Sequence, residues 1–298
     1  MMEIDALFFV EVLIGGLLSG VMYSLVALGF VLVYKSSGVF NFAQGAMLLF
    51  AALTFVSLVE RGWPVWLVLA ITLLTISLVG MLIERTVLRP LVNQPPIILF
   101  VATLGVSYVI EGAAQLIWGT QVHALDLGID DLPFEAFGVM ISIFDLFAAG
   151  VAALLVLAIS LFFRYTHTGL AFRAVADDAF AGLAVGLNIG RLWGVVWAAA
   201  GIVALVAGLL WGARLGVQFS LSLVVLKALP VLVLGGFDSI GGVIIAGLLV
   251  GAIEKIGSVY LGPLLGGGIE SWIAYAVALL FLLVKPSGLF GSRHLARL

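Results

Sequence analysis

Long apolar runs separated by short polar breaks make up most of this chain. A run of about twenty apolar residues is long enough to cross a bilayer as a helix, whereas a membrane-spanning barrel would show short alternating segments. Alternating segments of that kind are absent, so the pattern predicts an all-α, polytopic transmembrane helix bundle with about nine crossings. The expected crossings cover residues 9–34, 41–60, 63–84, 97–118, 141–163, 192–211, 221–242, 243–254 and 269–284.

Composition supports the same conclusion. Of the 298 residues, 64% are hydrophobic and 10% are charged, with a mean hydropathy of +1.31, far from the composition of soluble domains. We expect one transmembrane domain over residues 1–298. The absence of cysteine excludes disulfides and thiolate metal sites, and no basic patch suggests a nucleic-acid partner. The acidic N-terminal start has no evident cleavage site, so we expect the first apolar segment to be retained.

The stretch 164–193 is the longest part of the chain that cannot lie comfortably in hydrocarbon. It begins at Arg164 and also carries Arg191, and such positive charges mark the cytoplasmic side of a membrane protein. Its apolar residues recur every three or four positions and share one helical face, while Arg173 and Asp177 form an i,i+4 pair on another. The pattern predicts a short amphipathic cytoplasmic helix, interrupted near residues 186–190.

The apolar face of this helix has more than one candidate partner. A helix that lies on lipid usually carries Lys and Arg on its polar face, whereas this one carries two Asp. Its many small residues, such as Ala174 and Ala181, make it slim enough for a groove in another protein. A plain loop helix that packs on its own bundle is the alternative, because amphipathicity shows only that one face is covered.

The distribution of charge sets the expected orientation. Most of the 13 Lys and Arg fall on the side of residues 164–193, which predicts an external N-terminus and a cytoplasmic C-terminus. The loop 119–139 contains four acidic residues and no Lys or Arg, so we place it outside. A calcium site there is the alternative to a solvated surface, but the spacing lacks the ligand order of a known calcium loop.

Four polar side chains in the expected crossings could line a polar path. Asn41 and Gln44 are three residues apart on one helix face, where amides either tie helices together or line such a path. Glu111 lies in the outer part of a crossing, where it serves a path or polar network unless it reaches the interface. Lys227 either pairs with a substrate carboxylate, snorkels to an interface or forms an internal ion pair.

Glycines suggest where helices approach or break. Gly16 and Gly20 form a small-xxx-small pair, and residues 246–251 repeat small side chains, so both stretches should pack closely. A glycine-rich break follows Lys227, at residues 235–242. Because exposed backbone is tolerated at membrane depth only under protein or water, the segment before this break is either a short helix or a re-entrant element.

The stretch YKSSGVFNFAQGAMLLFAA, residues 34–52, resembles the signature after the first helix of permease subunits from branched-chain amino-acid ABC importers. In that signature a short turn is followed by N-x-A-x-G, which Asn41, Ala43 and Gly45 match. Residues 169–192 are similar to the cytoplasmic coupling region of the same family. The L-K-A around Lys227 and the glycine pattern at 235–242 extend the resemblance over most of the chain. It points to the LivH/LivM type and is closer to the LivH type.

The resemblance implies a transmembrane permease subunit of an ABC importer in the bacterial inner membrane. It further implies two ABC ATPase subunits, a second related permease subunit and a periplasmic substrate-binding protein as partners, besides membrane lipid. A groove on the ATPase would receive the cytoplasmic coupling region, residues 164–191. The implied coupling residues are Gly169, Arg173, Asp177, Asp178, Ala184 and Gly186.

Several functions compete with an importer of branched-chain amino acids. Close relatives of that family carry urea, short amides or other amino acids, and the permease sequence does not decide among these substrates because the receptor sets selectivity. An ion-coupled secondary transporter usually has intramembrane carboxylates or broken helices in two matching halves. This sequence has only a glycine-rich break and scattered charges in its apolar segments. We expect no enzyme, catalytic residue, metal or cofactor, since the sequence has no H-E-x-x-H and no evident Ser/His/Asp grouping. It also has no P-loop, so an ATPase must come from another chain.

Overall fold

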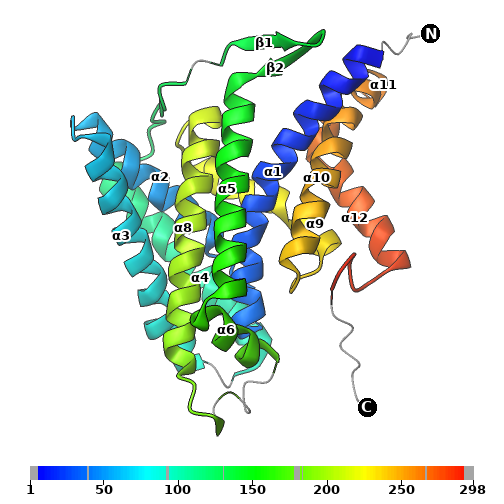
Figure 1. Cartoon of the computed structure of the whole chain (residues 1–298). Helices are drawn as coiled ribbons and strands as arrows, with labels where there is room; N and C mark the ends of the chain where they lie inside the picture. The colour runs from blue at the N-terminus through cyan, green and yellow to red at the C-terminus, as the bar shows by residue number, and fades with distance from the viewer. Residues whose placement is uncertain are drawn as a thin grey trace. The chain divides into compact units, whose positions relative to one another are not determined.

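The computed structural model describes residues 6–38, 40–91, 94–129, 131–177, 182, 184–265 and 267–291 (Figure 1). Helices account for most of this part of the chain, as the apolar runs predict. The α-helices are α1 (Ala6–Ser37), α2 (Gln44–Glu60), α3 (Val65–Ile83), α4 (Pro96–Trp118), α5 (Ile143–Tyr165), α6 (His167–Asp177), α8 (Ile189–Leu215), α9 (Val224–Gly235), α10 (Ile240–Ile256), α11 (Gly262–Leu265) and α12 (Ile273–Val284). The shorter elements are π-helical η1 (Glu84–Leu88) and η4 (Gly257–Leu261), 3-10 helical η2 (Arg89–Leu91), η3 (Phe219–Leu223) and η5 (Ile269–Ser271), and strands β1 (Pro133–Ala136) and β2 (Val139–Ser142).

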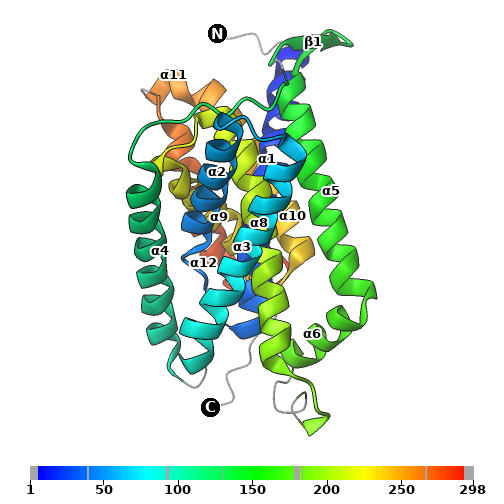
Figure 2. The same cartoon turned by 90° about the vertical axis from the view of Figure 1, so that its left-hand side faces the viewer.

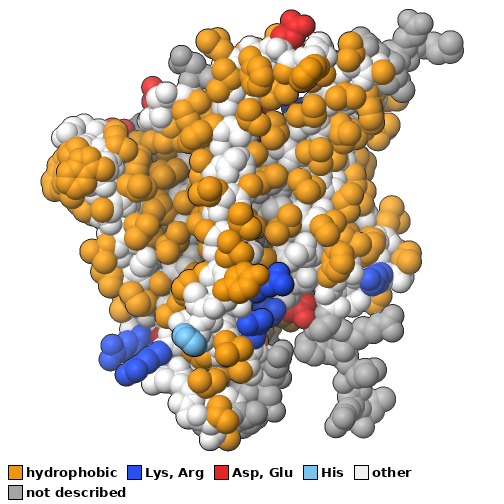
Figure 3. Space-filling model, in the orientation of Figure 1, with side chains coloured by type: hydrophobic (Ala, Val, Ile, Leu, Met, Phe, Trp, Pro, Cys, Tyr) orange, Lys and Arg blue, Asp and Glu red, His pale blue; other side chains and the backbone are white. Residues whose placement is uncertain are grey.

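Length and hydropathy make most of these helices membrane spans. In the described part of the chain, 6 helical stretches are long and apolar enough to cross a bilayer, and the apolar helices Gln44–Glu60, Phe219–Gly235 and Ile273–Val284 are shorter. Hydrophobic side chains cover most of the face seen in Figure 3. An exposed apolar surface of this extent suits lipid, so the polytopic helical fold expected from the sequence is confirmed.

The chain divides into two compact units, and each draws on several parts of the sequence. The first unit contains Met1–Ala27, Gly128–Leu154 and Leu226–Leu298. The second unit contains Leu28–Leu127 and Leu155–Val225. A single transmembrane domain over the whole chain stays a prediction.

Close backbone contacts hold the second unit together, where α2, α3 and α8 pack side by side (Figure 2). A Cβ atom added at Gly80 would lie 2.5 Å from the Trp197 carbonyl oxygen, and one at Gly208 would lie 2.6 Å from the Leu48 carbonyl oxygen. Neither distance is compatible with a side chain. Small residues thus let α8 approach both α2 and α3, which is how membrane helices gain packing energy without a hydrophobic driving force.

The first unit uses the same device between α1 and α10. A Cβ at Gly16 would meet the Gly251 carbonyl oxygen at 2.8 Å, and a Cβ at Gly20 would lie still closer to the Gly247 carbonyl oxygen. As the α1 number rises the α10 number falls, so the two helices are antiparallel. Ser24 adds a hydrogen bond from its hydroxyl to the Val243 carbonyl at 3.3 Å. The close packing expected at these small residues is confirmed.

A β-hairpin lies within the loop that follows α4, where the sequence suggested only a solvated acidic surface. β1 and β2 are antiparallel, with Pro133 opposite Ser142 and Ala136 opposite Val139. Phe137 at the turn has a positive φ of 55°, beside Gly138 at 80°. The hairpin runs directly into α5 (Figure 1), so it sets where that helix begins.

The glycine-rich break after Lys227 separates two helices. α9 is a short helix of 12 residues with Pro230 inside it. Gly236 then adopts a φ of 101°, and a Cβ there would lie 2.6 Å from the Gly291 nitrogen, so glycine is required on both counts. Ser239 caps α10 by accepting a hydrogen bond from the Gly242 amide at 3.0 Å. The helix ends abruptly and α10 starts afresh.

Candidate functional site

The polar segment, defined as residues 164–191, begins with α6 packed on the end of α5. The Phe172 ring lies 4.8 Å from the Phe163 ring, and the Phe172 side chain is buried. Gly169 is buried against the Phe163 backbone, so closely that a Cβ would clash with its carbonyl group. Gly169 therefore serves the tight turn between the helices. One face of the expected amphipathic helix is covered by the chain itself.

The rest of the polar segment presents exposed apolar and small side chains. Leu170 is 59% exposed and Val185 is 76% exposed. Ala184, directly before Val185, is exposed as well. Gly186 is also exposed and has a φ of 83°, which marks the expected interruption before α8. Arg173 donates a hydrogen bond to the Arg164 carbonyl at 3.0 Å. Asp178 and the side chain of Asp177 lie outside the described residues.

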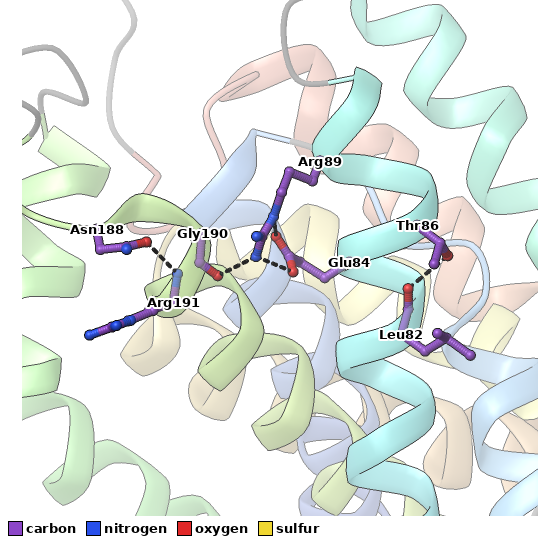
Figure 4. Close-up of polar contacts among 7 residues, drawn as sticks. All are labelled: Leu82, Glu84, Thr86, Arg89, Asn188, Gly190 and Arg191. Atoms are coloured by element: carbon purple, nitrogen blue, oxygen red, sulfur yellow. Dashed lines mark hydrogen bonds and ion pairs between the residues drawn. The ribbon is translucent and has the colours of Figure 1, made fainter.

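An ion pair and a hydrogen bond tie the segment that follows α3 to the start of α8 (Figure 4). The Arg89 guanidinium donates to both oxygens of Glu84, at 2.9 and 2.8 Å, and donates to the Gly190 carbonyl at 3.0 Å. The Glu84 side chain is only 2% exposed. A Cβ at Gly190 would lie 2.8 Å from the Arg89 guanidinium carbon, so glycine gives the arginine room. We call Glu84, Arg89 and Gly190 the arginine clamp.

Asn41 and Gln44 come together in the interior of the second unit. Both are buried, and the Asn41 amide nitrogen donates to the Gln44 side-chain oxygen at 3.2 Å. The Gln44 amide nitrogen reaches the Ala200 carbonyl on α8 at 3.2 Å, and the Asn41 oxygen accepts from the Ala43 amide at 3.1 Å. Gly29 leaves space for the Gln44 side chain, because a Cβ there would clash with it. These contacts tie α1, α2 and α8 to one another.

Lys227, in the first unit, forms an internal ion pair. Its ammonium lies 2.7 Å from the Glu254 carboxylate on α10 and 5.9 Å from the centroid of the Tyr23 ring. The Lys227 side chain is 40% exposed, whereas that of Glu254 is 11% exposed. Of the roles left open for Lys227, the internal ion pair is present here. A half-exposed charge inside an apolar stretch faces water or another protein rather than lipid, because the cost in hydrocarbon is several kcal/mol, roughly 3 or more.

Glu111 is half-buried on α4 in the second unit, as are the neighbouring Gly112 and Ala113. Its carboxylate makes no hydrogen bond or ion pair to another residue in the described part of the chain. Seven residues separate it from the end of α4 at Trp118, which corresponds to about 10 Å along a helix. Glu111 thus lies within the half of the crossing that ends at Trp118, where an unpaired charge is costly.

Comparison with known proteins decides what these features belong to. Residues 12–285 match the family described as "Branched-chain amino acid transport system / permease component". This chain belongs to that family. It is 29% identical to the high-affinity branched-chain amino acid transport system permease protein LivH of Salmonella typhimurium, over 96% of each chain. It is 28% identical to the corresponding permease protein BraD of Pseudomonas aeruginosa, over 95% of this chain and 96% of that protein.

A solved structure supports the permease fold. "PsaBC from Streptococcus pneumoniae in complex with Fab" aligns over 94% of this chain and 93% of that chain, with a TM-score of 0.52 and 16% identity. This likeness shows the fold alone. The family match confirms that the chain is a permease subunit of an ABC importer of the LivH type, as the resemblance implied.

The family is one of transport permeases rather than enzymes, and a permease of this class works with separate ATPase and substrate-binding components. Lys227 was predicted from the sequence as a candidate, but its partner Glu254 was missed, and neither Glu84 nor Arg89 was given a role. A signal was present for Glu254, since a charge inside an apolar helix usually has a partner and Glu254 closes the next apolar run. The five-residue spacing of Glu84 and Arg89 gave no such signal, because an α-helix brings residues three or four apart together.

Proposed function

We propose that this permease carries branched-chain or related amino acids across the bacterial inner membrane, driven by separate ATPase subunits. The relatives named above are permeases for branched-chain amino acids, and they match almost the whole chain. By itself the permease would perform no chemistry. It would expose a path alternately to the two sides of the membrane while other subunits hydrolyse ATP.

The observation that carries the substrate class is the ion pair of Lys227 and Glu254. A free amino acid is a zwitterion, and a fixed ammonium beside a fixed carboxylate offers both complementary charges. Lys227 keeps two-fifths of its side chain exposed, so its ammonium remains accessible to a passing carboxylate. Asn41 and Gln44 would then support the path by holding its helices, and Glu111 would add a charge near its outer end.

Coupling to ATP hydrolysis would run through the polar segment. Leu170 and Val185 expose apolar side chains, which would suit a groove on an ATPase. Gly169 would set the angle of α6, and Gly186 the turn into α8. Arg173, Asp177, Asp178 and Ala184 would complete the docking surface.

The arginine clamp would pass movement of the polar segment to the membrane helices. Gly190 is the second residue of α8, and Arg89 follows the end of α3, so a shift at the docking surface pulls on both helices together. Because Glu84 is buried, breaking the pair would leave a charge without a partner. A rigid link of this kind moves its two ends as one body.

The assembly would contain two ATPase subunits, a second related permease and a soluble receptor outside the membrane. The N-terminus would lie outside and the C-terminus in the cytoplasm, as the distribution of Lys and Arg suggests. The hairpin β1–β2 would then lie on the outer side. A permease for urea or short amides is the main competitor, but neutral ligands have no need of a charge pair.

Transport by the reconstituted importer tests this function. Proteoliposomes with the permease pair, both ATPases and the receptor should take up radiolabelled leucine when ATP is inside the lumen on the ATPase side, and should not take up urea. Lys227→Met should slow leucine uptake by about tenfold or more, since a charge-assisted hydrogen bond is worth about 1.5–3 kcal/mol. Lys285→Met is the matched control. Lys285 is exposed, and in the described chain its ammonium bonds only to the Leu289 carbonyl.

A charge swap separates recognition from folding. The double variant Lys227→Glu with Glu254→Lys keeps an ion pair but reverses it. If the pair recognises substrate, the swapped protein folds normally and remains slow. Full uptake by the swapped protein would mean that the pair is only structural, and urea uptake without leucine uptake would replace the proposed substrate.

A further inference from the structure

A pocket of about 400 Å³ lies within the first unit, between the start of α1, the β1–β2 hairpin and the end of α10. Its volume is within the range of small-ligand sites, roughly 300–1,000 Å³. Most of its lining is apolar, including Phe8 and Val12. Three charged side chains also line it: Glu11, Asp145 and Lys255.

Lys255 supplies the positive charge of this pocket. It lies in the last turn of α10 and is exposed, and its ammonium makes no hydrogen bond or ion pair with any residue that the structure describes. Its side chain runs over the glycine face of α1: a Cβ added at Gly16 would lie 3.0 Å from Lys255 Cβ, and one at Gly15 would lie 3.8 Å from Lys255 Cε. Because these glycines have no side chains, the Lys255 side chain can lie directly against α1. An ammonium at this depth needs an anion or water.

The hairpin contacts both acidic residues of the pocket, Glu11 through its carboxylate and Asp145 through its backbone amide. One oxygen of Glu11 accepts a hydrogen bond from the Met140 amide at 3.2 Å, and the other has no partner among the described residues. The Ser142 hydroxyl accepts from the Asp145 amide at 3.0 Å and donates to Asp131 at 2.6 Å, which fixes the first turn of α5. The pocket therefore offers a cation and two carboxylates on a fixed frame.

A ligand that fits carries an anion, a cation and an apolar tail. Asp145 lies in the first turn of α5 and Glu11 in the second turn of α1, near the ends of helices long enough to cross the membrane, which is close to the level of lipid headgroups. We propose that the pocket binds a phospholipid with a zwitterionic primary-amine headgroup, phosphatidylethanolamine, with the phosphate on Lys255 and the ammonium on Glu11. Asp145 adds negative potential beside the ammonium, and the apolar wall around Phe8 receives the start of an acyl chain.

The charge arrangement distinguishes this lipid from its neighbours in the membrane. A primary ammonium donates hydrogen bonds to a carboxylate, whereas the trimethylated amine of phosphatidylcholine has no N–H to donate. The headgroup of phosphatidylglycerol carries a net negative charge and no cation, so its phosphate could pair with Lys255 but no group in it would pair with the two carboxylates. Of the three lipids, only phosphatidylethanolamine has both a phosphate for Lys255 and a hydrogen-bonding ammonium for Glu11.

Native mass spectrometry of the full chain in detergent tests the proposal. The protein is titrated separately with dioleoyl phosphatidylethanolamine, phosphatidylcholine and phosphatidylglycerol. We expect the first lipid to bind about tenfold more tightly than the others, the effect of about one lost charged contact. Lys255→Met should abolish this preference, and Lys285→Met should keep it.

Two further variants keep the test independent of folding. Glu11→Gln retains an acceptor for the Met140 amide but removes the charge, and Gly15→Val fills the pocket at a position where a Cβ meets only the end of the Lys255 chain, at 3.8 Å. Both should lower phosphatidylethanolamine binding to the level of phosphatidylcholine while the melting temperature holds. Equal binding of the three lipids, or unchanged binding in all three pocket variants, would mean only an annular lipid and overturn the proposal. Displacement of the lipid by free leucine would overturn it as well, in favour of an amino-acid site.

Discussion

Arg89 and Glu84 form a two-pronged ion pair although five residues separate them, with nitrogen–oxygen distances of 2.9 and 2.8 Å. The π-helical turn Glu84–Leu88 makes this geometry possible, because π-helical bonds join residues five apart and place their side chains on one side. The Arg89 amide itself donates to the Glu84 carbonyl. The π-helical turn therefore brings Glu84 and Arg89 together, and Arg89 in turn bonds to the Gly190 carbonyl.

Replacing Arg89 by lysine should uncouple transport from ATP hydrolysis. Lysine is a point charge that cannot make two parallel bonds to Glu84 and also reach the Gly190 carbonyl. We expect ATPase activity of the assembled importer to persist while leucine uptake falls about tenfold, which corresponds to about 1.4 kcal/mol. Uptake and hydrolysis are measured on the same proteoliposomes. Arg85→Lys, at an exposed arginine one turn earlier, is the control, and an equal loss in both variants would remove the clamp from the mechanism.

Alanine at Asn41 or Gln44 should destabilise the protein before it affects the path. Each change leaves buried partners unsatisfied, at a cost of about 1–3 kcal/mol. We expect a lower melting temperature in detergent for both variants. Thr86→Ala is the control, since its exposed hydroxyl bonds only to the Leu82 carbonyl of its own helix. A normal melting temperature with slow uptake would instead favour a direct role in the path.

Features that depend on neighbouring residues in the chain could be predicted from the sequence, whereas features without a local pattern could not. Helical crossings such as α3 and α8 depend on local apolar length, and their existence was predicted correctly, with ends that differ by a few residues. The helix packing at Gly16 and Gly20 could be anticipated because small residues have few other uses in a crossing. β1 and β2 were missed because each has only four residues and Val139 alone among these eight is buried, so no alternating pattern stands out.

Polar pairing was harder to predict than helical structure. Hydropathy places Lys227 and Glu254 in apolar runs but does not say which charges face each other, since this depends on how α9 and α10 pack. The same holds for Gln44 and the Ala200 carbonyl, which are 156 positions apart. Tertiary contacts of single residues carry no periodic signal along the chain.

A charge on the exposed surface of the polar segment should prevent ATPase docking. Val185→Glu puts a carboxylate on a side chain that is 76% exposed, where a partner's groove would have to desolvate it. We expect the ATPase to be lost from a detergent pull-down while the melting temperature stays unchanged. Val122→Glu is the matched control, because Val122 is similarly exposed in the loop after α4. Normal recovery of the ATPase with Val185→Glu would move the docking surface elsewhere.

A single methyl group should separate α1 from α10. A Cβ at Gly247 would lie 2.7 Å from the Gly20 carbonyl oxygen and still closer to the Ser24 hydroxyl, so Gly247→Ala must push the helices apart. Overpacking of this kind costs about 1–3 kcal/mol, and the melting temperature should fall accordingly. Gly241→Ala is the control on the same helix, because a Cβ there meets nothing within 4 Å. If both variants melted alike, the close approach would contribute nothing to stability, and the small residues of α10 would need another explanation.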